Sequence, residues 1–394
     1  MLIAPKSHYN PASESGLAQS ELAISVFTDE SDFERLRPEW EGLRQDNKEQ
    51  DPFLSCDWFA TWWHAFGRHR QLHLVTAREQ GRLRAILPMM LEPVWRHGIR
   101  LRRLAALSND HTPRFDLVRD GDDDNLLRAI WNHLMTVEDQ WDVLDFPRLS
   151  AESTTADRFG RLAMEQGVSY SNWQRAPRSP WIQIQSCWDD YLDSRSASFR
   201  KGLRRKMRRL SSLGKVGLET ITGRNALDQV LADGLQIEAE GWKGTNGTAI
   251  SSQPAAVAFY SELAGIMSAR GQLRLHFLTL DDVRIAFDYS ILTNRCLYSL
   301  KAGHSSAYAH YSPGTLMLAL IVQAAHEEDL IGVDLLGDAD EFKMHWTDAT
   351  RTNPWLHCYS RSWRGRLLHV IKCSLIPTLR PVPWPLSRKT DRAG

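Results

Sequence analysis

Four consecutive residues, Ser312-Pro313-Gly314-Thr315, have the chemistry of a helix start that can hold an anion. Serine is a preferred N-cap and proline fits the first helical position, so a helix is predicted to begin here. Gly314 has no side chain, so a ligand can approach the amides of Gly314 and Thr315. Unpaired donors and the positive end of the helix dipole favour a phosphate at that point. The alternative is a helix start that binds nothing.

The residues before this helix start extend the predicted anion loop. A short apolar strand is expected at 297–300, and Lys301 and Gly303 directly after it could add a charge and allow close backbone access. The other members predicted to contact the anion are Leu300, Ala302 and Tyr311. The segment Leu316 to Val322 has seven residues without a polar side chain, so we expect a helix buried nearly all round. Such a helix would aim its N-terminus rigidly.

Two carboxylates of the second half, Asp288 and Glu240, are candidates for moving a proton. In the strand expected at 284–292, alternation places Asp288 on the face opposite Ile285 and Phe287. Asp288 could act as a base or bind a cationic acceptor, or it could be a structural, hydrogen-bonded aspartate. Glu240 ends a predicted helix at the unfavourable end of the dipole, which suggests a retained role, with an exposed helix end as the alternative.

His304 in the loop could relay a proton at neutral pH, although a loop histidine can also be a plain surface residue. Asp338 and Lys343 follow the strand expected at 332–336, at the end where open sheets place ligands. We expect these two residues to line the substrate site, with a surface ion-pair turn as the alternative.

The elements that must position these residues occur twice in the same order. Each half shows a strand, two helices, a three-strand meander, a helix and one more strand. The first copy is expected at 23–27, 31–43, 57–66, 72–77, 83–90, 99–107, 126–137 and 142–146. The second is expected at 216–221, 225–238, 255–268, 273–280, 285–292, 297–300, 316–326 and 332–336. We interpret this order as an internal duplication of an α+β domain, although a mixed chain can also be divided this way by chance.

The loop of the first half that corresponds to the anion loop is acidic. It spans 108–125 and supplies Asp116, Asp120, Asp122, Asp123 and Asp124 before its helix. Like charge would repel a phosphate, so we expect an anion site in the second half alone.

Length and composition fit a two-domain globular protein. The chain has 394 residues, 42% hydrophobic and 24% charged, with 48 basic and 48 acidic residues. Zero formal charge means that any attraction to nucleic acid or membrane must be local. The five scattered cysteines form no C-x-x-C pair, which argues against disulfides and a metal site and favours the cytoplasm. Residues 1–20 are expected to be a flexible arm without a signal peptide.

Two segments carry local positive charge. Residues 195–215 are predicted to form an amphipathic helix with one very basic face, which could grip phosphates of coenzyme A, tRNA, a nucleotide-linked sugar or lipid, or simply be solvated. The tail 363–394 mixes basic and apolar residues, so it could rest on an anionic membrane; a packed helix with a disordered end is the alternative.

The order of meander, loop with exposed amides, buried helix and strand resembles the GNAT acyltransferase fold, in which that loop cradles the pyrophosphate of acyl-coenzyme A. The segments 299–316, 333–343 and 238–244 look like bacterial GNAT proteins often associated with cellulose or exopolysaccharide biosynthesis. Those proteins are similar in plan to Fem-like peptidyltransferases, which carry two GNAT domains. The sequence departs from the Q/R-x-x-G-x-G/A loop of ordinary GNAT enzymes, with Ala309-His-Tyr-Ser-Pro-Gly-Thr in its place.

The resemblance implies an α+β fold with two tandem GNAT-like domains, each a mostly antiparallel sheet with flanking helices. We place an N-terminal domain without a cofactor loop at 21–180 and a C-terminal domain with the acyl-CoA site at 181–362. Trp242 and Lys243, inside the family-like segment 238–244, are expected to contact the substrate.

The implied activity is direct acyl transfer from a coenzyme A thioester, acetyl-CoA first among them, to a small-molecule or sugar-linked amine. Polysaccharide or cell-envelope metabolism is the expected setting, in the cytoplasm or at the inner membrane. The alternatives are a Fem-like transferase that uses aminoacyl-tRNA and a non-catalytic polyanion-binding subunit for polysaccharide assembly.

Overall fold

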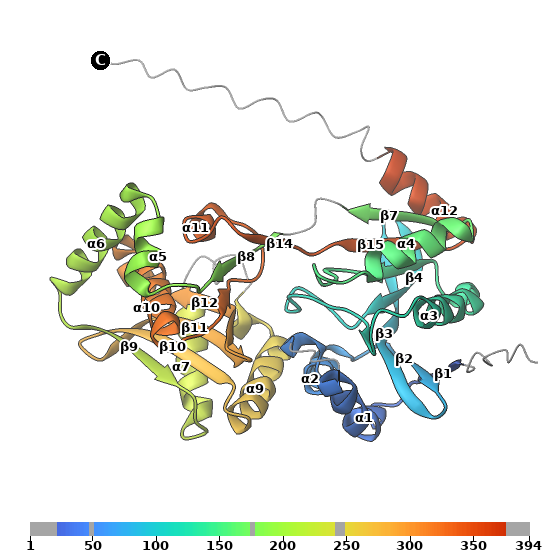
Figure 1. Cartoon of the computed structure of the whole chain (residues 1–394), viewed down its shortest axis with the longest axis horizontal. Helices are drawn as coiled ribbons and strands as arrows, with labels where there is room; N and C mark the ends of the chain where they lie inside the picture. Colours follow the sequence, from blue (N-terminus) through green and yellow to red (C-terminus); the bar gives the residue numbers. More distant parts are fainter. Residues whose placement is uncertain (1–21, 47–50, 174–177, 241–248, 376–394) are drawn as a thin grey trace, which may run out of the picture.

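A computed structural model describes residues 22–46, 51–173, 178–240 and 249–375 and contains two β-sheets, each flanked by helices (Figure 1). The first sheet has the order β1-β2-β3-β4-β6-β15-β7, and β5 pairs with β3. Its strands are β1 (Leu22–Phe27), β2 (Gln71–Glu79), β3 (Arg82–Arg96), β4 (Ile99–Ala106), β5 (Val118–Arg119), β6 (Val143–Phe146), β7 (Ser169–Trp173) and β15 (Trp355–Tyr359). The helices of this half are α1 (Asp32–Asp46), η1 (Pro52–Leu54), α2 (Cys56–Phe66), α3 (Asp124–Thr136), η2 (Glu138–Gln140) and α4 (Thr155–Glu165).

The second sheet has the order β14-β8-β13-β12-β11-β10-β9. Its strands are β8 (Arg178–Gln183), β9 (Val216–Ile221), β10 (Leu273–Leu280), β11 (Val283–Thr293), β12 (Cys296–His304), β13 (Gly332–Asp334) and β14 (Thr350–Thr352). Its helices are α5 (Trp188–Ser194), α6 (Ala197–Ser211), α7 (Leu227–Glu240), η3 (Ile250–Ser252), α9 (Pro254–Ala269), η4 (Ser306–Tyr311), α10 (Pro313–Glu327) and α11 (Glu341–Met344). The chain continues into α12 (Trp363–Val370) and η5 (Ile371–Leu375).

The two halves share one plan. Strands β4 and β6 pair in parallel in the first sheet, as β12 and β13 do in the second, and the other neighbouring strands pair antiparallel. A helix crossover, α3 or α10, joins each parallel pair. This arrangement confirms the predicted α+β fold with two similar halves.

The sheets exchange strands, which the sequence did not predict. Strand β8 follows β7 in the chain but pairs between β13 and β14 of the second sheet. Strand β15 follows β14 but inserts between β6 and β7 of the first sheet. The range 181–362 expected for the second domain therefore includes a strand of the first sheet.

Opposite faces of the second sheet carry different helices. Phe287 and Tyr289 pack in a core with α7 and α9, whereas Ile285 and Ala286 pack in a second core with α10. The expectation that Ile285 shares a face with Phe287 is wrong, because the β10–β11 register shifts at Leu278 and reverses the alternation there.

Aromatic side chains join the two halves. Trp58 of α2 meets Phe259 of α9 edge to face at 5.2 Å, and Phe53 meets Tyr298 of β12 at 5.4 Å. These residues belong to one continuous core that includes side chains from both sheets. The halves therefore pack as one body across an apolar interface.

Candidate active site

The start of α10 is formed largely as predicted. Ser312 is the N-cap and Pro313 the first helical residue. Ser312 adopts a φ of 58° and caps without its side chain, while its carbonyl accepts from the amide of Thr315 at 3.0 Å. The Thr315 amide is thus engaged in the first turn, contrary to the expectation that it is free. The Gly314 amide has no hydrogen-bond partner within the described part of the chain.

Charged and aromatic side chains surround this helix start. The ring of His304 lies beside Gly314, because a Cβ atom built on the glycine would be 3.7 Å from His304 Nδ1. Lys206 of α6 donates to Thr315 Oγ1 at 3.5 Å, and the Arg209 guanidinium lies 5.5 Å from the centre of the Tyr311 ring. The basic helix is therefore packed against the predicted anion loop. Sequence reasoning missed this contact, because 109 residues separate Lys206 from Thr315.

Strand β12 is longer than predicted and carries a bulge. It runs to His304, so Lys301 to Gly303 belong to the strand rather than to a loop. Tyr289 of β11 pairs with Lys301 and Ser290 with Ser299, which leaves Leu300 as the extra residue. A bulged residue stands outside the ladder, so the backbone of Leu300 is not paired with β11 in the regular way.

The same strand separates from its parallel neighbour. Pairing between β12 and β13 covers Cys296 to Tyr298, opposite Gly332 to Asp334, and the last six residues of β12 continue beyond it. In the first half, β4 pairs with β6 as far as Ala105, one residue from its end, and its register with β3 is unbroken. The opening between parallel strands is therefore a feature of the second half.

Asp288 lies beside this bulge and is only 3% exposed. Its carboxylate accepts hydrogen bonds from the hydroxyls of Ser290 and Ser299, and Ser299 directly precedes the bulged residue. Both sequence interpretations of Asp288 remain compatible with this geometry. His276 stands opposite it in β10, and burial lowers the pKa of its imidazole to about 3, so the ring is neutral at pH 7.

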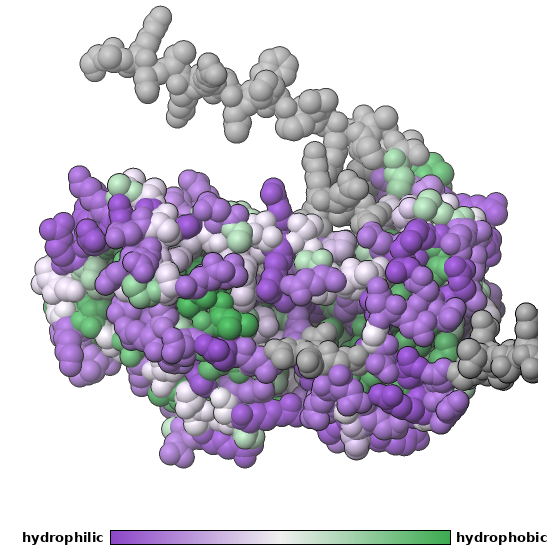
Figure 2. Space-filling view, in the orientation of Figure 1, coloured by the Kyte–Doolittle hydropathy of each residue, from purple (hydrophilic) through white to green (hydrophobic). Residues whose placement is uncertain are grey.

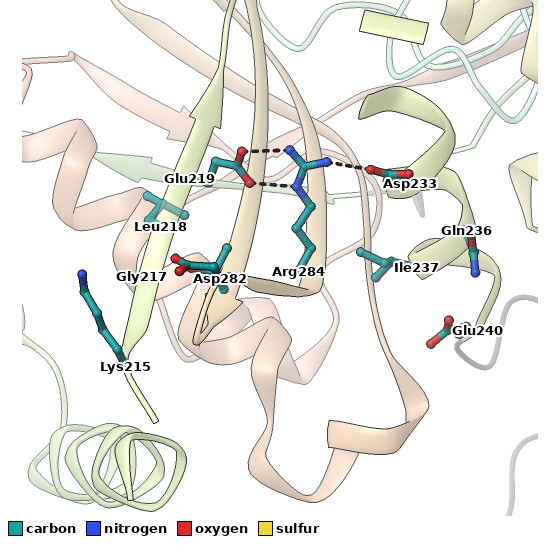
Figure 3. A pocket seen from close by; sticks show the side chains of 11 residues that line it. Lys215, Gly217, Leu218, Glu219, Asp233, Gln236, Ile237, Glu240, Asp282 and Arg284 are labelled. Carbon is teal, nitrogen blue, oxygen red and sulfur yellow. Dashed lines mark hydrogen bonds and ion pairs between the residues drawn. The ribbon is translucent and has the colours of Figure 1, made fainter. Parts of the chain in front are cut away.

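Glu240 lies in a different place. It lines a polar pocket of about 870 Å³ between α7 and the β9–β11 strands (Figure 3). Arg284 in this pocket is bound by Glu219 at 2.8 Å through both carboxylate oxygens and by Asp233 at 2.8 Å. Asp288 and His304 do not line the pocket, so the structure does not join the three predicted catalytic residues into one cluster.

The remaining predicted residues have structural surroundings of their own. A Cβ atom on Gly303 would lie 2.5 Å from the Glu238 Cα atom, so this glycine allows α7 to pack on β12. Lys301 Nζ lies 5.9 Å from the centre of the Tyr260 ring of α9, on the face of the sheet away from α10. The Lys301 ammonium is therefore directed away from the α10 N-terminus, contrary to the predicted anion contact. The backbone access predicted for Gly303 stays a prediction.

Lys343 stabilises the turn after β13. Its ammonium donates to the carbonyls of Leu336 at 2.8 Å and Asp338 at 3.4 Å. These contacts hold the turn through backbone carbonyls, and the substrate contact expected of Asp338 and Lys343 stays a prediction. Trp242 and Lys243 lie outside the described residues.

The acidic loop of the first half is neutralised by arginines. Asp120 pairs with Arg84 at 3.0 Å, Asp122 with Arg119 at 3.0 Å, and Asp124 with Arg158. Repulsion by free carboxylates is thus a weaker distinction between the halves than expected. The stronger difference is the strand geometry of β12 and β13.

Part of the second half matches a known protein family. Residues 197–344 match the family model described as "Acetyltransferase (GNAT) domain", and the match includes the bulge, Asp288 and α10. The chain contains a GNAT-superfamily domain. No match was found among curated proteins.

Solved structures share the fold over both halves. The crystal structure of FemX has a TM-score of 0.56 and 11% identity, covering 84% of this chain and 97% of that one. The C-terminal domain of a protein assigned as lysylphosphatidylglycerol synthetase from Agrobacterium fabrum has a TM-score of 0.51 and 13% identity, covering 85% and 96%. A conserved protein of unknown function from Bacteroides thetaiotaomicron scores 0.50 with 11% identity, covering 86% and 100%. Identities this low show the fold alone.

The described residues contain no group of three or more His, Cys, Asp or Glu side chains that could hold a metal ion. Among the helices formed by those residues, none has the length and apolar character needed to cross a bilayer.

Proposed function

We propose that the protein is an acyl-CoA-dependent N-acyltransferase that transfers the acyl group directly to an amine. The observation that carries the proposal is the opening between β12 and β13 at the Leu300 bulge, in the half that matches an acetyltransferase domain. An exposed strand edge can pair with an extended chain that bears amides, and the pantetheine arm of coenzyme A is such a chain.

The start of α10 suits the phosphates of the same molecule. The Gly314 amide and the helix dipole favour an anion, and Lys206 and Arg209 add positive charge within one helix turn of each other. Among coenzyme A thioesters, acetyl-CoA is the one that we propose as the cosubstrate.

The chemistry requires a deprotonated amine and a donor for the developing oxyanion. The Leu300 backbone at the bulge would supply the donor. Asp288, linked to the bulge through the Ser299 hydroxyl, would accept the amine proton, and His304 beside Gly314 could return a proton to the leaving thiolate.

A transferase that uses aminoacyl-tRNA is the second candidate, and the surface of α6 favours it. Lys201, Arg204, Arg205 and Arg208 are exposed and form no ion pair within the described residues. Hydrophilic residues predominate over this helix in Figure 2. A phosphate backbone would bind such a face, as would the polyanion of a non-catalytic assembly subunit.

The setting we propose is polysaccharide or cell-envelope metabolism on the cytoplasmic side of the inner membrane. Helix α12 exposes Trp363, Leu367 and Val370 at helical spacing, with Arg364 and Arg366 beside them, and hydrophobic residues are visible over this helix in Figure 2. Such a helix can lie on an anionic bilayer. Co-sedimentation with anionic vesicles tests the idea, and equal recovery with neutral vesicles would contradict it.

Thermal unfolding with coenzyme A, acetyl-CoA and tRNA distinguishes the candidates, because a ligand that binds the folded state raises the midpoint temperature by mass action. We expect a rise with both coenzyme A species. No rise at millimolar thioester would refute the main proposal, and a rise with tRNA alone would favour the second candidate.

A further inference from the structure

A second pocket, about 650 Å³ in volume, lies between the two halves. Its walls come from segments 114–122 and 150–154 of the first half, from Tyr298 of β12, and from Arg351 and Asn353 near β14. Sites for small molecules typically measure about 300 to 1,000 Å³. The pocket is thus large enough for a molecule of sugar size.

The position of this pocket can be compared with that of the proposed cofactor site, because the two halves share one plan. Segments 114–122 and 150–154 follow β4 and β6, just as η4 and residues 335–340 follow β12 and β13. The pocket therefore lies beyond the ends of the parallel strands of the first half, as the proposed cofactor opening lies at the ends of those of the second, although β4 and β6 themselves do not separate.

The buried charges of the pocket compensate one another. Arg114, only 6% exposed, pairs with Asp51 at 3.1 Å and with Asp334, and Arg351 lies 3.5 Å from Asp334. Asp116 accepts from the Thr155 hydroxyl at 2.7 Å. Since these charges already have partners, the pocket does not call for a strongly charged ligand.

A largely buried polar side chain of the pocket nevertheless lacks a partner. Asn353 is 5% exposed, and its side-chain amide forms no hydrogen bond within the described part of the chain. The amide is not among the polar atoms that are sealed from solvent, so a ligand that supplies hydroxyl groups can pair with it. Tyr298 lines the same pocket, with the Arg114 guanidinium 5.7 Å from the centre of its ring.

We propose that this pocket binds the acceptor, and that the acceptor is a small hydroxyl-rich amine of the amino-sugar class. The inference rests on the proposed acyltransferase function. Tyr298 is two residues from Leu300, so the pocket ends roughly 7 Å along the strand from the bulge. The amine nitrogen bonds to the thioester carbonyl carbon and the C–S bond breaks. Of the two protons that the ammonium loses, one goes to the thiolate and the other to solvent.

The test uses the full-length protein and D-glucosamine as the probe, titrated by saturation-transfer NMR. Asn353→Leu removes the unpaired amide at similar volume, and we expect about tenfold weaker binding. Asn125→Leu, on the exposed first turn of α3, is the matched control and should bind as the wild type does. Thermal unfolding checks each variant, and Ser150→Ala, which also lines the pocket, replaces Asn353→Leu if that variant does not fold.

The outcomes separate the two proposals. Absence of saturable glucosamine binding to the wild type, or equal binding by the pocket variant and the control, overturns the acceptor pocket. Acetyl-CoA binding is measured separately. If acetyl-CoA does not bind but glucosamine binding depends on the pocket variant, the acyltransferase proposal falls, together with the acceptor role, and the pocket stands as a sugar site.

Discussion

A glutamate at position 314 should prevent thioester binding while leaving the fold at least as stable as that of the wild type. The new Cβ atom would lie 3.7 Å from His304 Nδ1, an ordinary van der Waals distance. Replacing glycine inside a helix contributes about 0.5 to 1 kcal/mol of stability, and a carboxylate in the first turn adds about 0.3 to 1 kcal/mol. The free energy of unfolding of Gly314→Glu should therefore rise by about 1 to 2 kcal/mol.

The same carboxylate should repel the pyrophosphate. Two unit charges about 4 Å apart interact by about 1 kcal/mol in bulk water and about 4 kcal/mol at an effective dielectric constant near 20. Each phosphate charge therefore weakens binding by a factor of about 5 to about 1,000. Gly314→Gln has the same shape without the charge, so the ratio of the two dissociation constants isolates the electrostatic part.

Isothermal titration with acetyl-CoA at two salt concentrations measures this ratio, which should shrink at high salt because exposed charges are screened. Chemical denaturation gives the stability of both variants. Equal affinity of the Glu and Gln variants would refute the placement of phosphates at the α10 N-terminus, and so would a ratio that does not respond to salt.

Three further changes address the surrounding strands. Asp288→Asn should lower kcat by about 10²-fold or more without changing the KM for the thioester, and an unchanged kcat in steady-state kinetics would make the residue purely structural. Gly303→Ala should destabilise the fold by about 1 to 3 kcal/mol in urea denaturation, because its Cβ atom would overlap the Glu238 backbone; wild-type stability would contradict the close packing of α7. Burial lowers the pKa of His276 from 6.5 to about 3, so below pH 6.5 the unfolded state binds more protons than the folded state. The free energy of unfolding should then fall by up to about 1.4 kcal/mol per pH unit from about pH 6.5 to about pH 3, and His276→Gln should show a shallower fall; identical slopes would oppose this assignment.

Local signals in the sequence were sufficient for most elements of the fold. Periodicity, caps and turns located both meanders and both crossover helices, because these depend on residues close together in the chain. The end of β12 was missed because Lys301-Ala-Gly-His304 is polar and contains glycine, and its place in the sheet comes from pairing with β11. The exchange of β8 and β15 depends on pairing between distant segments, which no local pattern records.

For the site, the sequence was sufficient for the local helix start but not for the contacts between distant elements. Ser312 and Pro313 gave the helix start directly, since capping chemistry is local. The Ser299–Asp288 hydrogen bond and the Lys206–Thr315 contact join separate elements, and only the folded chain brings them together. Glu240 was selected because it ends a helix at the negative end of the dipole, and the structure places it in a pocket that Asp288 does not line.

The exchanged strands constrain how this protein is made. The first sheet cannot be completed until residues 355–359 have left the ribosome, more than 180 residues after β7 has been synthesised. During that interval the edges of β6 and β7 are unpaired and open to association with other chains. Pairing between segments so far apart in the chain is slow to form. Each half needs a strand from the other part of the chain, so neither half is expected to be released by proteolysis or exchanged by recombination as an intact unit.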